Sequence, residues 1–203
     1  MERSVYHVMM DTPSNSAVMD QTKPPARERI LRTAHTLFYR EGIRSTGVDR
    51  IIAEAGVTKV TFYRHFPSKN DLILAFLDYR HRIWISWFQD ALRKYGNNLL
   101  AIAPVLQEWF ANSAFRGCAF INALGEMGSS MPEVAQRTMQ HKAELREVID
   151  GLLPENCDRE GLAGAVAMAI DGAVVRAAWG EPAEAIHGFK QLIEGMRCLK
   201  AQT

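Results

Sequence analysis

The stretch IIAEAGVTKVTFYRHFPSKNDLILAFL, residues 51–77, decides the fold of this chain. Apolar residues at Ile51, Ile52 and Ala55 predict one face of a short helix. Gly56 can end that helix, because glycine accepts the positive φ of a tight turn. Thr58 is placed to cap a second short helix over residues 59–65, which Pro67 cannot continue. Short helices joined by a glycine turn are typical of a helix-turn-helix.

Helical patterns continue on both sides of this stretch. From Arg27 onward the apolar spacing predicts a helix whose buried face is Ile30, Ala34, Leu37 and Phe38, and Gly42 is placed to end it as a left-handed cap. The segment Thr46-Gly-Val-Asp49 has the form of a capping box for the next helix. Ser68-Lys-Asn-Asp71 has the same form and predicts the start of a long helix, about residues 69–95.

The rest of the chain also has helical periodicity. We expect helices over about 99–114, 118–128, 132–152, 159–179 and 182–200, with a kink or a late start at Pro104. No alternation of apolar and polar residues predicts a strand, so the fold class is all-α with about nine helices. The predicted organisation is a disordered arm (1–25), a helix-turn-helix head (26–70) and a larger helical domain (71–203).

Positive charge is concentrated in the head. Residues 20–70 hold ten Lys and Arg against five Asp and Glu, whereas residues 71–203 hold thirteen against sixteen. Such a segment suits a polyanion, although charge alone is equally compatible with a solvated basic surface. The sequence has no apolar run near the roughly 20 residues of a membrane span, and its N-terminus lacks a signal-peptide pattern. We therefore expect no membrane partner and a cytoplasmic location.

The helix over 59–65 has the chemistry of a DNA-reading element. Its outward side chains are predicted to be Lys59, Val60, Thr61, Tyr63, Arg64 and His65. Hydroxyl and ammonium groups bind phosphate oxygens, Arg and Lys read guanine edges, and methyl groups contact thymine. Surface exposure without any contact is the alternative for Arg64 and Val60.

The same stretch resembles the DNA-binding head of the tetracycline-repressor (TetR-like) family. That family's heads follow I-A-x-x-A-G-V-(S/T)-x-x-x-(F/L)-Y-x-(H/Y)-F-x-(S/T)-K-x-x-L. This chain matches without a gap at Ile52, Ala53, Ala55, Gly56, Val57, Thr58, Phe62, Tyr63, His65, Phe66, Ser68, Lys69 and Leu72. The resemblance covers about residues 27–75 and implies that residues 59–64 enter the groove, with Thr58 beside them as a further candidate DNA contact. It also implies phosphate contacts from Tyr63, His65 and Lys69, and from Thr46 at the start of the preceding helix.

A second, shorter resemblance lies downstream. The segment Arg116-Gly-Cys-Ala-Phe120-Ile-Asn122-Ala is similar to a G-C-x-F-x-N segment in one branch of the family. The family's body is a helical domain that binds ligands and pairs with a second copy through its last two helices. The resemblance therefore implies a C-terminal ligand-binding and dimerisation domain.

Candidate ligand contacts are aromatic or polar side chains of this domain. They are Trp84, Trp87, Phe88, Trp109, Phe110, Asn122 and Glu126. Aromatic residues at helical spacing are more often core than pocket wall, and Asn122 or Glu126 can equally satisfy a helix end. Cys118 is either a buried small residue or a redox sensor beside Arg116.

The last two helices predict a subunit interface. Helix 159–179 is rich in small residues, which suits a helix that is either central within one subunit or at a subunit interface. Helix 182–200 has a broad apolar face that requires a partner. We expect a two-fold four-helix interface with the candidate residues Gly164, Met168, Asp171, Val175, Ile186, Phe189 and Ile193.

Enzymatic function is disfavoured by what the sequence lacks. It contains no nucleophile–base signature, no phosphate-binding glycine loop and no metal-ligand spacing of Cys or His. We therefore expect no catalytic residues, metal or cofactor. The sequence predicts a repressor that binds a palindromic operator as a homodimer and is released by a small molecule. The alternative is a regulator without a small-molecule ligand, either controlled by a partner protein or acting as an activator.

Overall fold

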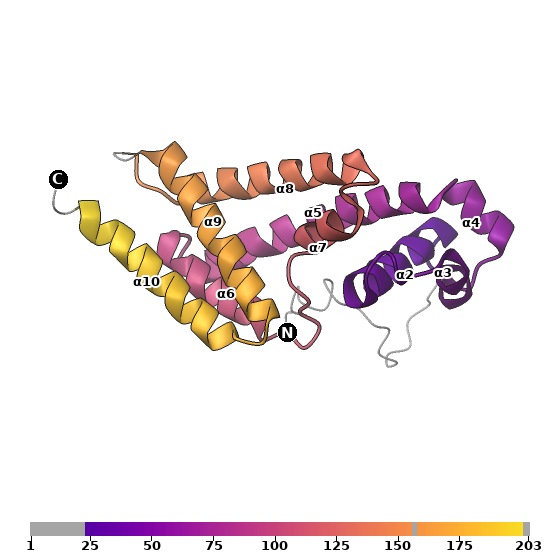
Figure 1. Ribbon diagram of the computed structural model, residues 1–203, viewed down its shortest axis with the longest axis horizontal. Helices are drawn as coiled ribbons and strands as arrows, with labels where there is room; N and C mark the ends of the chain where they lie inside the picture. Colours follow the sequence, from indigo (N-terminus) through magenta and orange to yellow (C-terminus); the bar gives the residue numbers. More distant parts are fainter. Residues whose placement is uncertain (1–22, 156–157, 201–203) are drawn as a thin grey trace. The chain divides into compact units, whose positions relative to one another are not determined.

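The computed structural model describes residues 23–155 and 158–200, and every regular element in these ranges is a helix (Figure 1). The elements are α2 (Ala26–Glu41), α3 (Val48–Ala55), α4 (Lys59–His65), α5 (Lys69–Lys94), the 3₁₀ helix η1 (Leu99–Ala101), α6 (Ile102–Phe110), α7 (Ala119–Met127), α8 (Pro132–Asp150), α9 (Arg159–Ala178) and α10 (Pro182–Lys200). The all-α prediction is confirmed for this part of the chain. Most of the predicted disordered arm lies outside the described residues.

One predicted helix is shorter than expected. The sequence predicts a helix over 99–114, but the structure has η1, whose first turn is capped by the Asn98 side chain, followed by α6. Pro104 lies in the first turn of α6, where its missing N–H leaves no hydrogen bond unmade. The late start is therefore confirmed, whereas the predicted end at residue 114 is wrong, since α6 ends at Phe110.

The described chain divides into two compact units. The first unit contains the residues up to Trp84 together with Asn122–Arg137, and the second contains Ile85–Ile121 together with the residues from Thr138 onward. Helices α5, α7 and α8 each contribute residues to both units. The domain boundary that the sequence places between residues 70 and 71 stays a prediction.

The core of the first unit forms around α2. Ile30, Ala34, Leu37 and Phe38 are all buried, as the periodicity of the sequence predicts. Helix α2 contacts both α3 and α4, and the ring of Phe38 meets that of Phe76 on α5 edge to face, with centroids 5.5 Å apart. Helix α2 therefore holds the two short helices against the start of α5.

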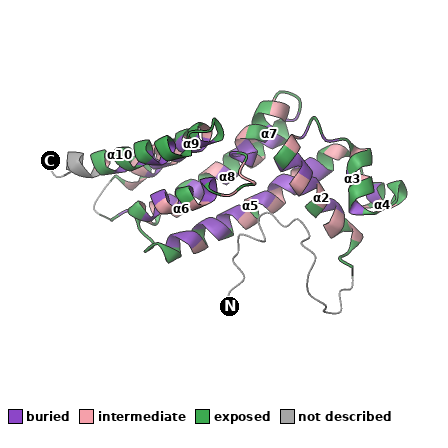
Figure 2. Cartoon of the chain, turned by 90° about the horizontal axis from the view of Figure 1, so that it is seen from below, coloured by how far each residue is buried: buried purple, intermediate pink, exposed green. Residues whose placement is uncertain are grey.

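The core of the second unit is formed by α6, α9 and α10, which contact one another pairwise. Val166 and Ile170 on α9 are buried in it, as are Phe189 and Ile193 on α10. Figure 2 shows that α9 and α10 also present many exposed residues along their length. Each of α9 and α10 therefore has a buried side and an exposed side.

Helix α9 is unusually apolar for a helix with so much exposed surface. It is long and apolar enough to cross a membrane, with a mean hydropathy of 1.5, and only 33% of that segment is buried within the chain. Length and composition alone are weak evidence of a span, because core helices of globular proteins satisfy the same criteria. An apolar helix with an exposed side is equally a surface for another protein chain.

Candidate nucleic-acid interface

Helix α4 is a short helix with well-defined ends. The Thr58 hydroxyl accepts a hydrogen bond from Thr61 N at 3.1 Å, so the predicted N-cap is confirmed. The helix ends at His65, and Phe66 has an extended backbone with a φ of −135° before Pro67. Phe62 is completely buried, and its ring packs against those of Tyr63 and Phe66. One buried aromatic residue thus fixes which side of α4 faces outward.

The outward side of α4 carries the side chains that the sequence predicts. Lys59, Val60, Tyr63 and Arg64 are exposed, while Thr61 and His65 are half-buried. Val60 is 79% exposed although it is apolar. An exposed valine among hydroxyl and cationic groups suits the major groove, where thymine methyl groups lie beside phosphate and base acceptors.

The turn between α3 and α4 is held by α2. Gly56 adopts the left-handed conformation, with φ 61° and ψ 47°. Arg29 on α2 donates from Nε to Ala55 O at 3.0 Å and from Nη2 to Gly56 O at 3.2 Å. Arg29 therefore satisfies two carbonyl groups at the end of α3, and it is not available as a free surface cation. This role of Arg29 could not be predicted from the sequence, because nothing in the local pattern distinguishes Arg29 from the other arginines of α2.

The capping box predicted at the start of α3 is wrong. Gly47 is the N-cap residue of α3, and no side chain caps this end. Thr46 is completely buried, and its hydroxyl donates to Gly42 O at 2.7 Å. Its side chain is therefore not presented to a phosphate in this structure.

The turn between α2 and α3 is held by a carboxylate from α7. Glu126 accepts from Ile43 N at 3.1 Å and from Arg44 N at 2.8 Å, and its backbone carbonyl accepts from Arg44 Nε at 2.7 Å. Gly42, with a φ of 91°, lies so close that a Cβ atom added there would be 3.2 Å from both carboxylate oxygens. Glu126, a sequence candidate for ligand binding, instead positions the head.

Lys69 meets the same turn from α5. Its Nζ donates to Ile43 O at 2.6 Å and lies 5.9 Å from the centre of the Phe38 ring. Burial lowers the pKa of Lys69, and the nearby Glu126 carboxylate opposes that shift. Lys69 thus has a structural partner in the absence of DNA. The phosphate contact implied by the family resemblance stays a prediction, and the Lys69 ammonium would have to bind the phosphate beside or in place of Ile43 O.

Acidic residues neutralise part of the basic charge of the head. Glu41 pairs with both Arg40 and Arg50, and these hydrogen bonds lower the pKa of Glu41 to about 2. Arg50 also pairs with Glu54 at 2.8 Å. No ion pair of the described residues includes Arg64, which is exposed at the end of α4. Among the cations of the head, Arg64 is therefore well suited to a DNA contact.

The candidate ligand residues are divided between the two units. Trp87 and Trp109 are buried with ring centroids 6.2 Å apart, and Phe110 and Phe115 pack against Trp109 in the same unit. Phe88 is also buried in the second unit, whereas Trp84, Asn122 and Glu126 belong to the first. Asn122 is exposed. The four aromatic candidates of the second unit are core residues of that unit in this structure.

The candidate interface residues fall into two groups. Ile186, Phe189 and Ile193 are buried within their own chain, so the prediction that they face a partner is wrong for this structure. Met168 is 76% exposed, Gly164 and Val175 are half-buried, and Asp171 forms an ion pair with Lys142. Cys118 is buried, with its sulfur 3.8 Å from Lys142 Nζ. The described residues contain no cluster of three or more His, Cys, Asp or Glu side chains suited to a metal ion.

Comparison with known proteins assigns the chain to a family. The family profile described as "Bacterial regulatory proteins, tetR family" matches residues 30–76. A TetR-family transcriptional regulator from Streptomyces coelicolor is 34% identical, with a TM-score of 0.77 over 85% of this chain and 89% of that chain. The chain belongs to the TetR family. It is therefore a DNA-binding transcriptional regulator with a helix-turn-helix, in a family of regulators rather than of enzymes.

Other relatives agree with this assignment over part of the chain or at the level of the fold. HTH-type transcriptional regulators of Staphylococcus aureus are 36% identical over 96 residues, which cover 45% of this chain and 52% of theirs. The chain thus spans about half the length of these curated relatives. The reduced form of Escherichia coli NemR has the same fold, with a TM-score of 0.73 at 18% identity over 84% of this chain and 96% of that chain.

Removal of the Glu126 carboxylate should weaken operator binding by loosening the head. Glu126→Ala leaves the N–H groups of Ile43 and Arg44 without their acceptor, which costs about 1–2 kcal/mol in a half-buried site. We expect faster hydrogen exchange at these two amides and a lower operator affinity in fluorescence anisotropy. Glu126→Gln keeps one acceptor oxygen, so its exchange rates and operator affinity should lie between those of the wild type and of Glu126→Ala.

The matched control is Glu147→Ala, which removes an exposed carboxylate from α8. In this variant, hydrogen exchange at the amides of residues 43 and 44 and the operator affinity should equal those of the wild type. Unchanged exchange at residues 43 and 44 in Glu126→Ala would contradict the positioning role of Glu126.

Proposed function

We propose that this TetR-family protein is a repressor that binds a near-palindromic operator as a homodimer and is released by a small molecule. The outward side of α4 is the main observation in support, since Lys59, Val60, Tyr63 and Arg64 are exposed together on one short helix. Such a helix fits the major groove, and two copies related by a two-fold axis require two equivalent half-sites. Family membership supports release by a small-molecule effector.

The glycines of the last two helices support dimerisation through α9 and α10. Gly164 and Gly172 on α9, and Gly188 and Gly195 on α10, have nothing within 4 Å of an added Cβ atom. Glycine inside a helix costs up to about 1 kcal/mol relative to alanine, and packing within this chain does not require these four glycines. Close approach of a second helix would require them, because a missing Cβ lets two backbones come together.

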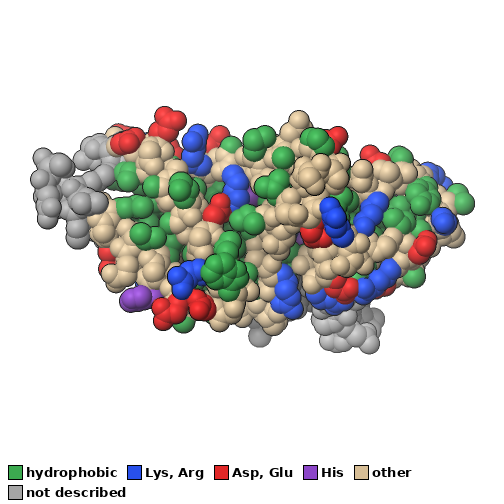
Figure 3. Space-filling view, viewed as in Figure 1, with side chains coloured by type: hydrophobic (Ala, Val, Ile, Leu, Met, Phe, Trp, Pro, Cys, Tyr) green, Lys and Arg blue, Asp and Glu red, His purple; other side chains and the backbone are tan. Residues whose placement is uncertain are grey.

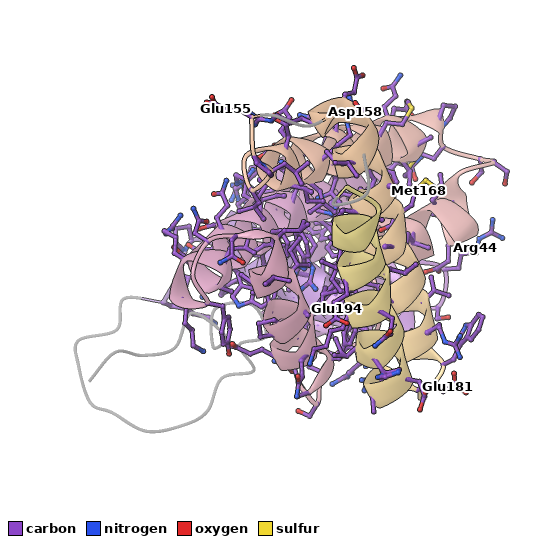
Figure 4. All side chains as sticks on the ribbon, turned by 90° about the vertical axis from the view of Figure 1, so that its left-hand side faces the viewer. Arg44, Glu155, Asp158, Met168, Glu181 and Glu194 are labelled. Atoms are coloured by element: carbon purple, nitrogen blue, oxygen red, sulfur yellow. The ribbon has the colours of Figure 1, made fainter. Side chains whose placement is uncertain are left out.

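Exposed apolar side chains accompany these glycines. Met168 lies one turn from both Gly164 and Gly172, and it projects from α9 into solvent (Figure 4). Leu192 on α10 is 53% exposed and lies one turn from Gly188. Hydrophobic side chains are visible on the face of the molecule to which α9 contributes (Figure 3). A second copy of the chain would bury this surface, which explains the apolar composition of α9 without a membrane.

Two substitutions separate affinity from specificity and test the proposed role of α4. Arg64→Ala should cost about 1–3 kcal/mol per half-site and relax the preference at one operator position, if Arg64 reads a guanine. Lys69→Ala should weaken binding to all sequences alike. It should also reduce the salt slope, which is the slope of log affinity against log salt concentration, by about one unit per half-site. Binding is measured by anisotropy on operator, point-mutated operator and random DNA at several salt concentrations.

Lys69→Arg is the matched control, because it keeps a cation at the α2–α3 turn. It should retain most of the salt slope that Lys69→Ala loses. If neither Arg64→Ala nor Lys69→Ala changes binding to any DNA, α4 does not enter the groove and the proposal fails.

A further inference from the structure

Arg80 is a buried cation on α5. Its side chain is only 1% exposed and is among the largest fully buried side chains of the described residues. Arginine is almost never fully buried unless an anion pairs with it, because desolvation of an isolated charge is very costly. The surroundings of Arg80 therefore require an explanation.

Among the described residues, Arg80 has only neutral partners. Arg80 Nη1 lies 3.4 Å from His35 Nε2, and the guanidinium carbon lies 4.1 Å from the centre of the Tyr39 ring. Arg80 Nη2 is buried and has no hydrogen-bond partner in the part of the chain that the structure describes. No ion pair among residues 23–155 and 158–200 includes Arg80. The guanidinium thus keeps both an unused donor and an uncompensated positive charge.

His35 adds no charge of its own beside Arg80. Burial, and to a lesser extent Arg80, lower the pKa of His35 to about 3, so its ring is neutral near pH 7. Its ring packs against Phe76, with centroids 5.8 Å apart, and meets Tyr79 edge to face at 5.2 Å. Arg80 therefore points into an aromatic environment between α2 and α5 of the first unit, where a Coulomb attraction is screened far less than in water.

We infer that Arg80 anchors an anion-binding site between α2 and α5 that takes a small organic monocarboxylate. A water molecule would satisfy Nη2 but would leave the charge uncompensated, whereas a carboxylate does both. Guanidinium groups match carboxylates in shape and charge. One unpaired cation balances one negative charge, and the rings of His35, Tyr39 and Phe76 favour an apolar body over a multiply charged anion such as phosphate.

An anion at this position would act on the DNA-binding head. It would join α2, which contacts α3 and α4, to α5, which both units share. Identification of the carboxylate as the effector that releases the operator rests on the proposed function, whereas its binding at Arg80 does not. The two are therefore measured separately.

The first measurement is the melting temperature of the full chain with butyrate and benzoate, each compared with its amide, butyramide or benzamide. A carboxylate should raise Tm by about 5–10 °C at a concentration about one hundred times its Kd. The uncharged amide and equal ionic strengths of chloride or phosphate should not. Equal stabilisation by carboxylate and amide, or by carboxylate and inorganic anions, would overturn the inference, as would no stabilisation by either carboxylate.

Substitutions at Arg80 test the position of the site. Arg80→Met removes the charge but keeps an unbranched side chain; it should fold with an unchanged or higher Tm and show no response to carboxylate. Arg80→Lys, which loses the two-pronged donor, should bind at least about tenfold more weakly and remains informative if Arg80→Met does not fold. Arg82→Met, on an exposed residue of α5, should respond as the wild type does. A full carboxylate response in Arg80→Met or Arg80→Lys would overturn the assignment.

Operator binding, measured by anisotropy with and without the same carboxylate, separates this site from the proposed function. Release of the wild type but not of Arg80→Lys would support both. Stabilisation that depends on Arg80 without release of DNA would support the site and contradict its role as the effector site.

Discussion

Met168→Asp is expected to convert the protein into a monomer and to lower its operator affinity by more than about 100-fold. Met168 is 76% exposed and lies between two glycines of α9 that have open space above them. If a second copy covers this surface, an aspartate there becomes a buried charge without a partner, which strongly disfavours association. A monomer presents one α4 to one half-site and loses the gain of simultaneous binding. Light scattering should give a mass of 22.8 kDa rather than twice that value.

Two further variants make this prediction specific. Met139→Asp, on another exposed methionine, in α8, should remain a dimer and bind the operator normally. Phe189→Asp should instead prevent folding, because Phe189 is buried within its own chain and would place an unpaired carboxylate in the core. A Met168→Asp protein that stays dimeric would place the subunit interface elsewhere.

Acid is expected to destabilise the protein through His35 well before the carboxylates titrate. The pKa of His35 is about 3 in the folded chain, against 6.5 for the unperturbed side chain. Below pH 6.5 His35 is protonated in the unfolded state but stays neutral in the folded state. Its contribution to the free energy of unfolding is therefore fully present above pH 6.5 and is lost progressively between pH 6.5 and 3. At pH 4.5 this group alone should lower the free energy of unfolding by about 3 kcal/mol.

Urea denaturation at intervals between pH 7.5 and 4.5 measures this effect. His35→Gln keeps a polar group beside Arg80 but does not titrate, and it should remove most of the pH dependence in this range. His187→Gln, on an exposed residue of α10, is the matched control and should retain it. If the free energy of unfolding changes with pH equally in the wild type and in His35→Gln, a neutral, buried His35 is contradicted.

The parts of the fold that the sequence predicts well depend on local signals. Gly56, Thr58 and Pro67 mark both ends of α4, and Phe62 is the only residue of this helix that is fully buried. These features follow from backbone conformation, capping and helical periodicity, which act over a few residues. The outward face of α4 could therefore be assigned before any tertiary contact was known.

The contacts that position the head could not be predicted in this way. Glu126 meets Ile43 from 83 residues away, and Arg29 meets Ala55 from 26 residues away. Thr46 resembled a capping residue, but the tertiary structure buries it and uses its hydroxyl within the α2–α3 turn. Periodicity shows that a side chain has a partner without showing which one. For the same reason, the apolar face of α10 alone does not distinguish a subunit interface from the core of the chain, in which Ile186, Phe189 and Ile193 are buried.

In the proposed function, two copies of α4 enter the grooves of one operator. The most direct measurement is selection of binding sites from random DNA by the full chain, followed by sequencing. We predict an inverted repeat whose half-sites lie about one helical turn apart, roughly 34–36 Å, or somewhat more if the groove is widened. In the same selection, Arg64→Ala should lose the preference at one position of each half-site while it keeps the symmetry. A consensus without inverted symmetry, or no enriched sequence at all, would contradict the account.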